Sequence, residues 1–106
     1  MPKYLITGSY TVEGANGVLA EGGSGRVAAV NKLIASLGGT VESFYFGFGG
    51  DDFYVTVDAP SNVAIAAGTM TVAAAGGAGA RTIVLLTPEE VDAAAKLSPS
   101  YRAPGA

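Results

Sequence analysis

The feature that most constrains the fold is a β-hairpin pattern in the middle of the chain. Residues 41–48 (VESFYFGF) and 53–58 (FYVTVD) are rich in aromatic and β-branched residues, which favour strands. Between them stand Gly49, Gly50, Asp51 and Asp52, residue types that form tight turns. We therefore expect two antiparallel strands joined by this turn, and the rest of the fold has to be built around them.

The segment before the hairpin predicts a strand and then a helix in two pieces. Residues 3–10 (KYLITGSY) predict a strand in which neither face is strongly polar. Thr11 can cap a first helical piece, and glycines interrupt the pattern at residues 22–25. Ser24 can cap the second piece, whose apolar stripe runs to Leu37 before two glycines end it.

The segment after the hairpin predicts a helix, a strand and a short final helix. Residues 59–75 are rich in alanine and precede Gly76-Gly77, a typical helix end. Residues 81–86 (RTIVLL) predict the fourth strand. Residues 87–90 (TPEE) form a capping-box pattern with proline at the first helical position, which predicts a helix to Leu97.

This order of elements indicates an α+β fold of the ferredoxin-like type, βαββαβ, with an extra short C-terminal helix. Right-handed crossovers place both long helices on one face of a four-stranded antiparallel sheet. We expect a single domain over residues 1–97 and a tail over 98–106. Because both sheet faces carry apolar residues, we expect the open face to pair with a second sheet about 10 Å away, giving a homo-oligomer.

Composition excludes several classes of function. The chain has no cysteine and no histidine, so thiol chemistry, thiolate metal sites and the commonest general base are absent. With a net charge of −3 and six scattered basic residues, it lacks the basic surface that nucleic acids require. The N-terminus has no signal-peptide or membrane-span pattern, and we expect a cytoplasmic protein without a cofactor, metal, membrane or nucleic-acid partner.

The glycine-rich segment Glu21–Arg26 is a candidate anion site. Glycines let backbone N–H groups approach a ligand, a following helix presents its positive end, and Arg26 adds a charge. The segment lacks the ending of a phosphate-binding P-loop. The alternative interpretation is an ordinary glycine break between two helical pieces.

The adjacent carboxylates of Asp51 and Asp52 are candidates for acid–base chemistry or cation binding. Aspartate is also a common turn residue, which is the simpler interpretation. If either acts on a ligand, we expect Asp52, which adjoins the strand.

The tyrosines offer both apolar surface and a hydrogen-bonding hydroxyl. We expect Tyr10 and Tyr45 to lie on one sheet face near Ser24 and Arg26, where they would line a pocket. The aromatic residues Phe44, Phe46 and Phe48 alternate along one strand face, and we expect them in the core or in a subunit interface.

Five segments carry a resemblance to a known family: PKYLITGSYT at the start, GGSGR at Gly22–Arg26, SLGG at Ser36–Gly39, FYFGFGGDDFYV at Phe44–Val55 and LLTPEE at Leu85–Glu90. From Met1 to about Tyr101 the chain resembles the GYD domain family of small prokaryotic proteins. The turn that names this family usually has tyrosine before its final aspartate, where this chain has Asp51 followed by the matching Asp52. The resemblance, with a more distant one to dimeric α+β barrel proteins, implies a ferredoxin-like protomer that pairs through its sheet and implies no established reaction.

Three functions stay open from the sequence. The first is an oligomeric module that binds a small anionic or carbonyl-bearing molecule through Tyr10, Ser24, Arg26, Tyr45 and Asp52. The second is a small enzyme of the dimeric α+β barrel kind, with Asp52 as base and Tyr45 or Arg26 polarising an oxygen. The third is a purely structural assembly module.

Overall fold

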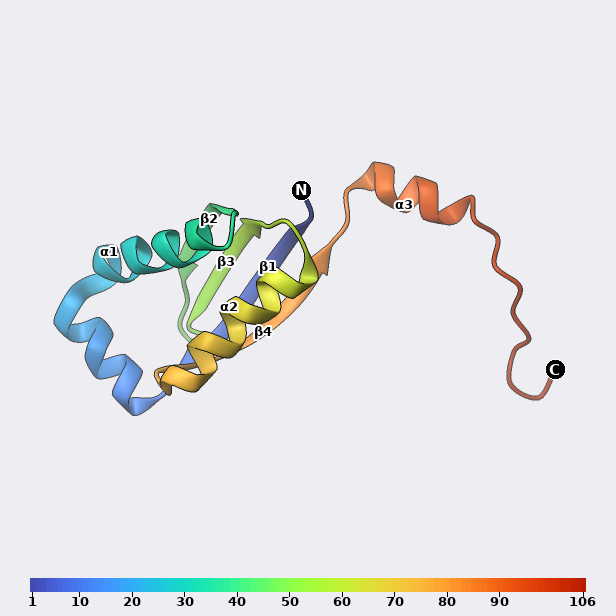
Figure 1. Ribbon diagram of the computed structural model, residues 1–106. Coiled ribbons are helices and arrows are strands. Elements are labelled where there is room, and N and C mark those ends of the chain that lie inside the picture. Colours follow the sequence, from blue (N-terminus) through green and yellow to red (C-terminus); the bar gives the residue numbers. More distant parts are fainter.

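The computed structural model describes residues 1–106, and its elements follow the predicted order (Figure 1). The first helix begins at its predicted cap, since the Thr11 hydroxyl accepts a hydrogen bond from the Gly14 N–H. The second begins at residue 62, later than the predicted residue 59, and the Ser61 hydroxyl caps it by accepting from the Ala64 N–H. The elements are β1 (Lys3–Tyr10), α1 (Val12–Ser36), β2 (Thr40–Phe46), β3 (Phe53–Asp58), α2 (Asn62–Ala75), β4 (Ala78–Leu85) and α3 (Pro88–Ala95).

The four strands form one antiparallel sheet in the order β2-β3-β1-β4, which confirms the ferredoxin-like fold. β1 is central and pairs Thr7 with Tyr54 of β3 on one side and with Arg81 of β4 on the other. Because side chains alternate along a strand, this register decides which residues share a face.

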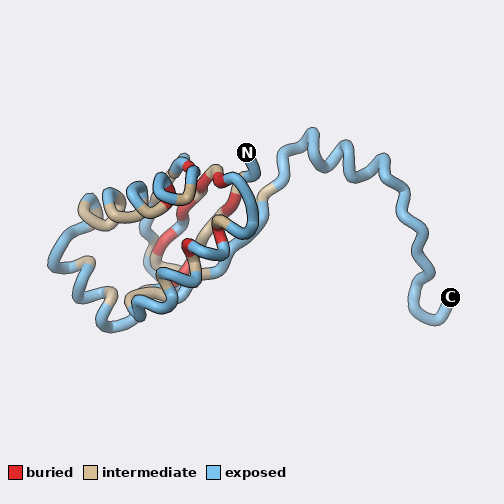
Figure 2. Tube along the Cα trace, in the orientation of Figure 1, coloured by how far each residue is buried: buried red, intermediate tan, exposed pale blue.

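Helices α1 and α2 cover one face of the sheet, where the small core lies (Figures 1 and 2). At the edge of this core the Tyr4 hydroxyl and the Asn62 Oδ1 atom form a hydrogen bond of 2.6 Å, which ties β1 to the start of α2. The buried hydrophobic residues are Tyr4, Ile34, Phe53, Val55, Val57, Ala59 and Ile65.

The other face carries no helix, and we call it the open face. It combines apolar side chains, among them Leu5, Tyr45, Tyr54 and Ile83, with three of the ion pairs of the molecule, which Lys3 and Arg81 form with carboxylates. Tyr45 is 71% exposed and Ile83 is 47% exposed, so this apolar surface faces solvent in a single chain.

The break predicted in the first helix is present, although its position differs from the predicted cap. Gly22 has φ 78° and ψ 168°, a conformation that side-chain-bearing residues rarely adopt, and the helical axis changes direction there. Ser24 was expected to cap the second piece, but the turn is made two residues earlier by Gly22. Ser24 lies inside the second piece and is exposed.

The hairpin has a longer connection than the predicted four-residue turn. β2 ends at Phe46, and residues 47–52 form the loop, closed by a hydrogen bond of 2.9 Å from the Gly47 N–H to the Asp52 carbonyl. Phe48 therefore leaves the strand and is fully exposed, whereas Phe44 packs against the core. The prediction that Phe48 shares a strand face with Phe44 and Phe46 is wrong, because the chain turns before reaching it.

The chain beyond β4 extends away from the packed body (Figure 1). The predicted capping box opens α3: the Thr87 hydroxyl accepts from the Glu90 N–H, and the Glu90 side chain accepts from the Thr87 N–H. The helix ends at Ala95, two residues before the predicted end. Every residue from Leu86 to Ala106 is exposed (Figure 2), and we call residues 86–106 the C-terminal arm.

Candidate functional site

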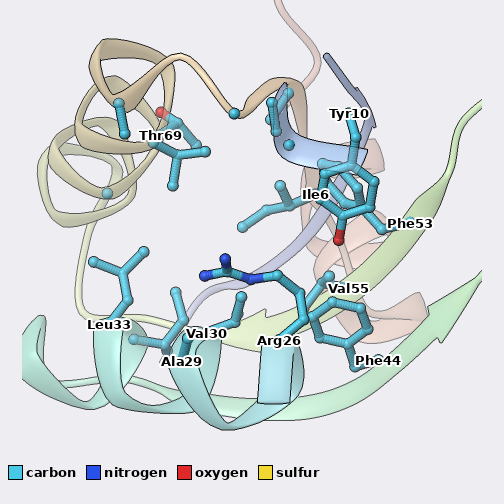
Figure 3. Close-up of a pocket in the computed structure, with 18 of the residues that line it drawn as sticks. Ile6, Tyr10, Arg26, Ala29, Val30, Leu33, Phe44, Phe53, Val55 and Thr69 are labelled. Atoms are coloured by element: carbon cyan, nitrogen blue, oxygen red, sulfur yellow. The ribbon is translucent and has the colours of Figure 1, made fainter. Parts of the chain in front are cut away.

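A cavity lies between the two helices and the covered face of the sheet (Figure 3). Its volume is about 210 Å³, and 14 of its 19 lining residues are hydrophobic. Cavities of about 150 Å³ with apolar walls are known to hold benzene. The space therefore fits a small molecule with a largely apolar body. Its apolar walls include Ile6, Val30, Leu33, Phe44, Phe53 and Val72.

Arg26 is the only lining residue with a formal charge. It lies one turn after the Gly22 kink, and its side chain extends into the cavity (Figure 3). The kink also brings Glu21 within reach, and the Arg26 Nη1 atom donates to Glu21 Oε1 at 3.3 Å. This bond is long, and both side chains are more than a third exposed, so the pair is weak. A guanidinium has five N–H donors, which leaves donors free for a ligand.

Tyr10 lies at the end of β1 beside the same part of the cavity, and its hydroxyl points toward Arg26 (Figure 3). Its ring packs on Phe53 with 5.2 Å between ring centroids. Burial raises the pKa of the Tyr10 phenol above its ordinary value of 10.0, against the opposing effect of Arg26. At neutral pH the phenol is therefore protonated and can donate a hydrogen bond to an oxygen that contacts Arg26.

Asp52 holds the backbone in place beside this cluster. Its Oδ2 atom accepts from the Tyr10 N–H at 2.9 Å, and its own N–H donates to the Gly8 carbonyl at 2.7 Å. Asp52 is not among the residues that line the cavity. The Asp52 carboxylate therefore holds the end of β1 through the Tyr10 N–H, and this hydrogen bond helps to position the Tyr10 side chain.

The remaining predicted site residues lie elsewhere. Tyr45 pairs with Tyr54 on the open face, so the expectation that Tyr45 and Tyr10 share a sheet face is wrong. The β1–β3 and β2–β3 registers set this, because each one-residue step along a strand reverses the face. Ser24 is exposed and does not line the cavity. Asp51 forms an ion pair with Arg81 at the open face.

Sequence reasoning missed the part of the cavity that α2 contributes. Thr69 and Val72 lie on its wall, and the Thr69 hydroxyl donates to the Ile65 carbonyl at 3.1 Å. No short motif marks these residues, because small and apolar residues surround the whole of α2. The apolar stripe predicted for the second helical piece includes Val30 and Leu33, which form part of the cavity wall.

The molecule contains no group of three or more His, Cys, Asp or Glu side chains placed to hold a metal ion. None of its helices combines the length and the apolar character needed to cross a membrane. The groups that the cavity offers to a ligand are the Arg26 guanidinium, the Tyr10 phenol and apolar walls.

Comparison with protein-family models matches the GYD domain over residues 4–95. The chain belongs to the GYD domain family. The match spans the whole sheet, both covering helices and α3, so the helix of the arm is part of the GYD domain. No curated protein and no solved structure matches this GYD chain.

We predict that this GYD protein loses stability as the pH rises above about 10, in part through Tyr10. Because the folded-state pKa is raised, the folded protein holds the phenol proton more tightly than the unfolded chain does. That contribution is complete below the unfolded pKa and is lost as the pH rises through the folded pKa.

Thermal midpoints between about pH 9 and about pH 11 check this, with Tyr10→Phe as the comparison. The Lys3 pKa is also raised, by hydrogen bonds to Glu42 and then Asp58, but Lys3 titrates in both proteins. The wild type should therefore lose more stability over this range than Tyr10→Phe. Equal losses would contradict a buried phenol at this site.

Proposed function

We propose that this protein is a homo-oligomeric module that binds a small, largely apolar molecule carrying a carboxylate or carbonyl group. The observation that carries the proposal is a guanidinium in an apolar cavity: Arg26 lines the cavity, no carboxylate does, and the one ion pair of Arg26, with Glu21, is weak. A carboxylate accepts paired N–H bonds from a guanidinium, and these bonds are stronger than neutral ones. Tyr10 can donate to the same ligand oxygen.

In the free protein the Arg26 guanidinium forms an ion pair with Glu21, and a ligand carboxylate would compete with Glu21 for this guanidinium. Its 3.3 Å contact is longer than a typical charge-assisted bond, and it is partly exposed to water. A ligand carboxylate held deeper in the cavity would meet less solvent competition. Binding is therefore expected to exchange one weak ion pair for a stronger one.

The test is binding of benzoate and hexanoate, compared with benzyl alcohol and hexanol, measured by NMR titration. We expect the acids to bind more tightly than the alcohols. Arg26→Met keeps most of the apolar stem and removes the charge, and it should weaken acid binding by about 10- to 100-fold, as expected for hydrogen bonds to a charged group. Lys32→Met is the matched control, since Lys32 is an exposed cation on the same helix.

Each outcome decides between the functions. Equal binding of acids and alcohols, or equal acid binding by wild type and Arg26→Met, would contradict the assigned role of Arg26. If none of the four probes binds, the protein is better described as an assembly module. The proton-transfer enzyme is not favoured by any contact, because the Asp52 carboxylate is held by the Tyr10 N–H outside the cavity lining.

Self-association through the open face is the second part of the proposal. The chain exposes 6968 Å², whereas a compact monomer of this mass exposes about 5,400 Å². The open face exposes the large apolar side chains of Tyr45 and Ile83, and the buried Thr7 hydroxyl at its centre has no hydrogen-bond partner within the chain. The exposed C-terminal arm contributes to this difference in area, and a second copy placed on the open face would cover the apolar side chains of that face. Location in the cytoplasm stays a prediction.

A further inference from the structure

The C-terminal arm carries a well-formed helix that buries none of its residues against the rest of the chain. All residues from Leu86 to Ala106 are exposed, and α3 has no buried residue. The radius of gyration is 16.8 Å, compared with about 13 Å for a compact domain of this length. The arm is thus a detached part of an otherwise packed molecule.

The sequence nevertheless specifies α3 strongly. Thr87 and Glu90 form a complete capping box with Pro88 in the first turn. Leu86 and Val91 stand at the positions of a hydrophobic staple, which fixes how the chain enters the helix. A helix of eight residues is nevertheless marginal in water without tertiary contacts. The helix therefore needs a surface that this chain, taken alone, does not provide.

One side of α3 is suited to such a contact. Val91, Ala94 and Ala95 fall on one side at helical spacing, and Glu89, Asp92 and Lys96 fall on the other. Val91 is 52% exposed and Leu86 is 58% exposed, so an apolar strip faces solvent. A strip without charges fits an apolar partner surface.

The arm leaves the body at the margin of the open face. It follows directly from Leu85, and Ile83 two residues earlier is an exposed apolar residue of that face. The apolar surface therefore continues from the open face onto the arm. A partner seated on the open face would lie beside the strip of α3.

We propose that the C-terminal arm of each subunit docks its Leu86–Val91–Ala94–Ala95 strip on a second copy of this chain, beside the paired open faces. The family match extends through Ala95, so the helix belongs to the domain, and the domain itself offers a sheet face on which Tyr45 and Ile83 are exposed. The inference rests on the proposed self-association and adds the arm as a part of it.

The test is hydrogen exchange of the α3 amides in the full-length protein at micromolar and submillimolar concentration. Docking on a second copy should slow their exchange by about tenfold or more at the higher concentration only, since an undocked short helix opens freely. Protection at both concentrations would show that the arm folds back on its own chain. Absence of protection at both would show that it docks nowhere, and either result overturns the proposal.

Two neighbouring substitutions supply the matched control. Ala94→Asp places a charge on the strip, and Ala93→Asp places the same charge one residue earlier on the opposite side, at similar cost to the helix. Ala94→Asp should raise the dimer dissociation constant by about tenfold or more, and Ala93→Asp should leave it nearly unchanged. Equal effects would overturn the assignment of the strip.

The proposed docking of the arm and the proposed pairing of the open faces can be tested separately. If a charge on the open face leaves association unchanged while Ala94→Asp weakens it, the sheet pairing is wrong and the arm contact stands. If only the open-face charge weakens association and α3 stays unprotected, the pairing stands and the arm proposal is wrong.

Discussion

Gly8→Ala is expected to destabilise the fold by about 3 kcal/mol or more, because the added methyl group has no space. Gly8 is buried in the central strand, and a Cβ there would lie 2.7 Å from the Phe53 ring and 2.9 Å from the Ala80 Cα, with the Gly79 carbonyl closer still. Two of these three groups are backbone and cannot move without breaking the β1–β4 pairing.

Thermal and urea unfolding of the purified variants measure this effect. A loss of about 3 kcal/mol corresponds to a fall in the midpoint of roughly 12 °C or more for a domain of this size. Gly79→Ala is the matched control: it makes the same change on the neighbouring strand, where a Cβ meets nothing within 4 Å. A Gly8→Ala protein as stable as Gly79→Ala would contradict the close approach of β1 and β4.

Ile83→Asp is expected to convert the proposed oligomer into monomers. Ile83 is 47% exposed in a single chain and lies in the same row of the open face as Leu5 and Thr56. In a symmetric pair the substitution appears twice, and each unpaired carboxylate taken from water costs more than the roughly 1 to 3 kcal/mol of a neutral polar group. The dimer dissociation constant should therefore rise by about 100-fold or more, since each 1.4 kcal/mol is about tenfold.

Sedimentation velocity over a range of concentrations checks this result. Met70→Asp is the control, because Met70 is 70% exposed on α2, on the opposite side of the sheet. A circular dichroism spectrum and a thermal midpoint show that Ile83→Asp remains folded. Wild-type protein that is monomeric throughout, or an unchanged dimer in Ile83→Asp, would contradict pairing through the open face.

The fold could be predicted from the sequence because its signals are local. The caps at Thr11, Ser61 and Thr87 lie within three residues of the N–H groups that they bind, and the strands contain the β-branched and aromatic residues that favour them. Errors fell at boundaries. Glycine tolerates several conformations, so a run of glycines does not reveal which member turns the chain, and Gly22 turned it where Ser24 had been predicted to cap.

The candidate site was only partly predictable. Arg26 was found because a charge beside a glycine break is visible in the sequence, and Tyr10 because a tyrosine on a strand face near Arg26 offers a hydroxyl to a pocket. Tyr45 was predicted on the wrong face. Alternation shows which residues of one strand share a face, but only the pairing register shows which residues of two different strands share a face.

The sequence by itself determined the order of elements, the α+β class and the scarcity of catalytic side chains, since these follow from local propensity and composition. Only the tertiary structure decided which residues meet. The packing of α1 on the sheet brought Arg26 and Tyr10 to one cavity. The pairing of β1 with β3 placed the Asp52 carboxylate where it accepts a hydrogen bond from the Tyr10 N–H. It also left the open face and the C-terminal arm without partners, because surfaces that pack depend on shape and on neighbours distant in the chain.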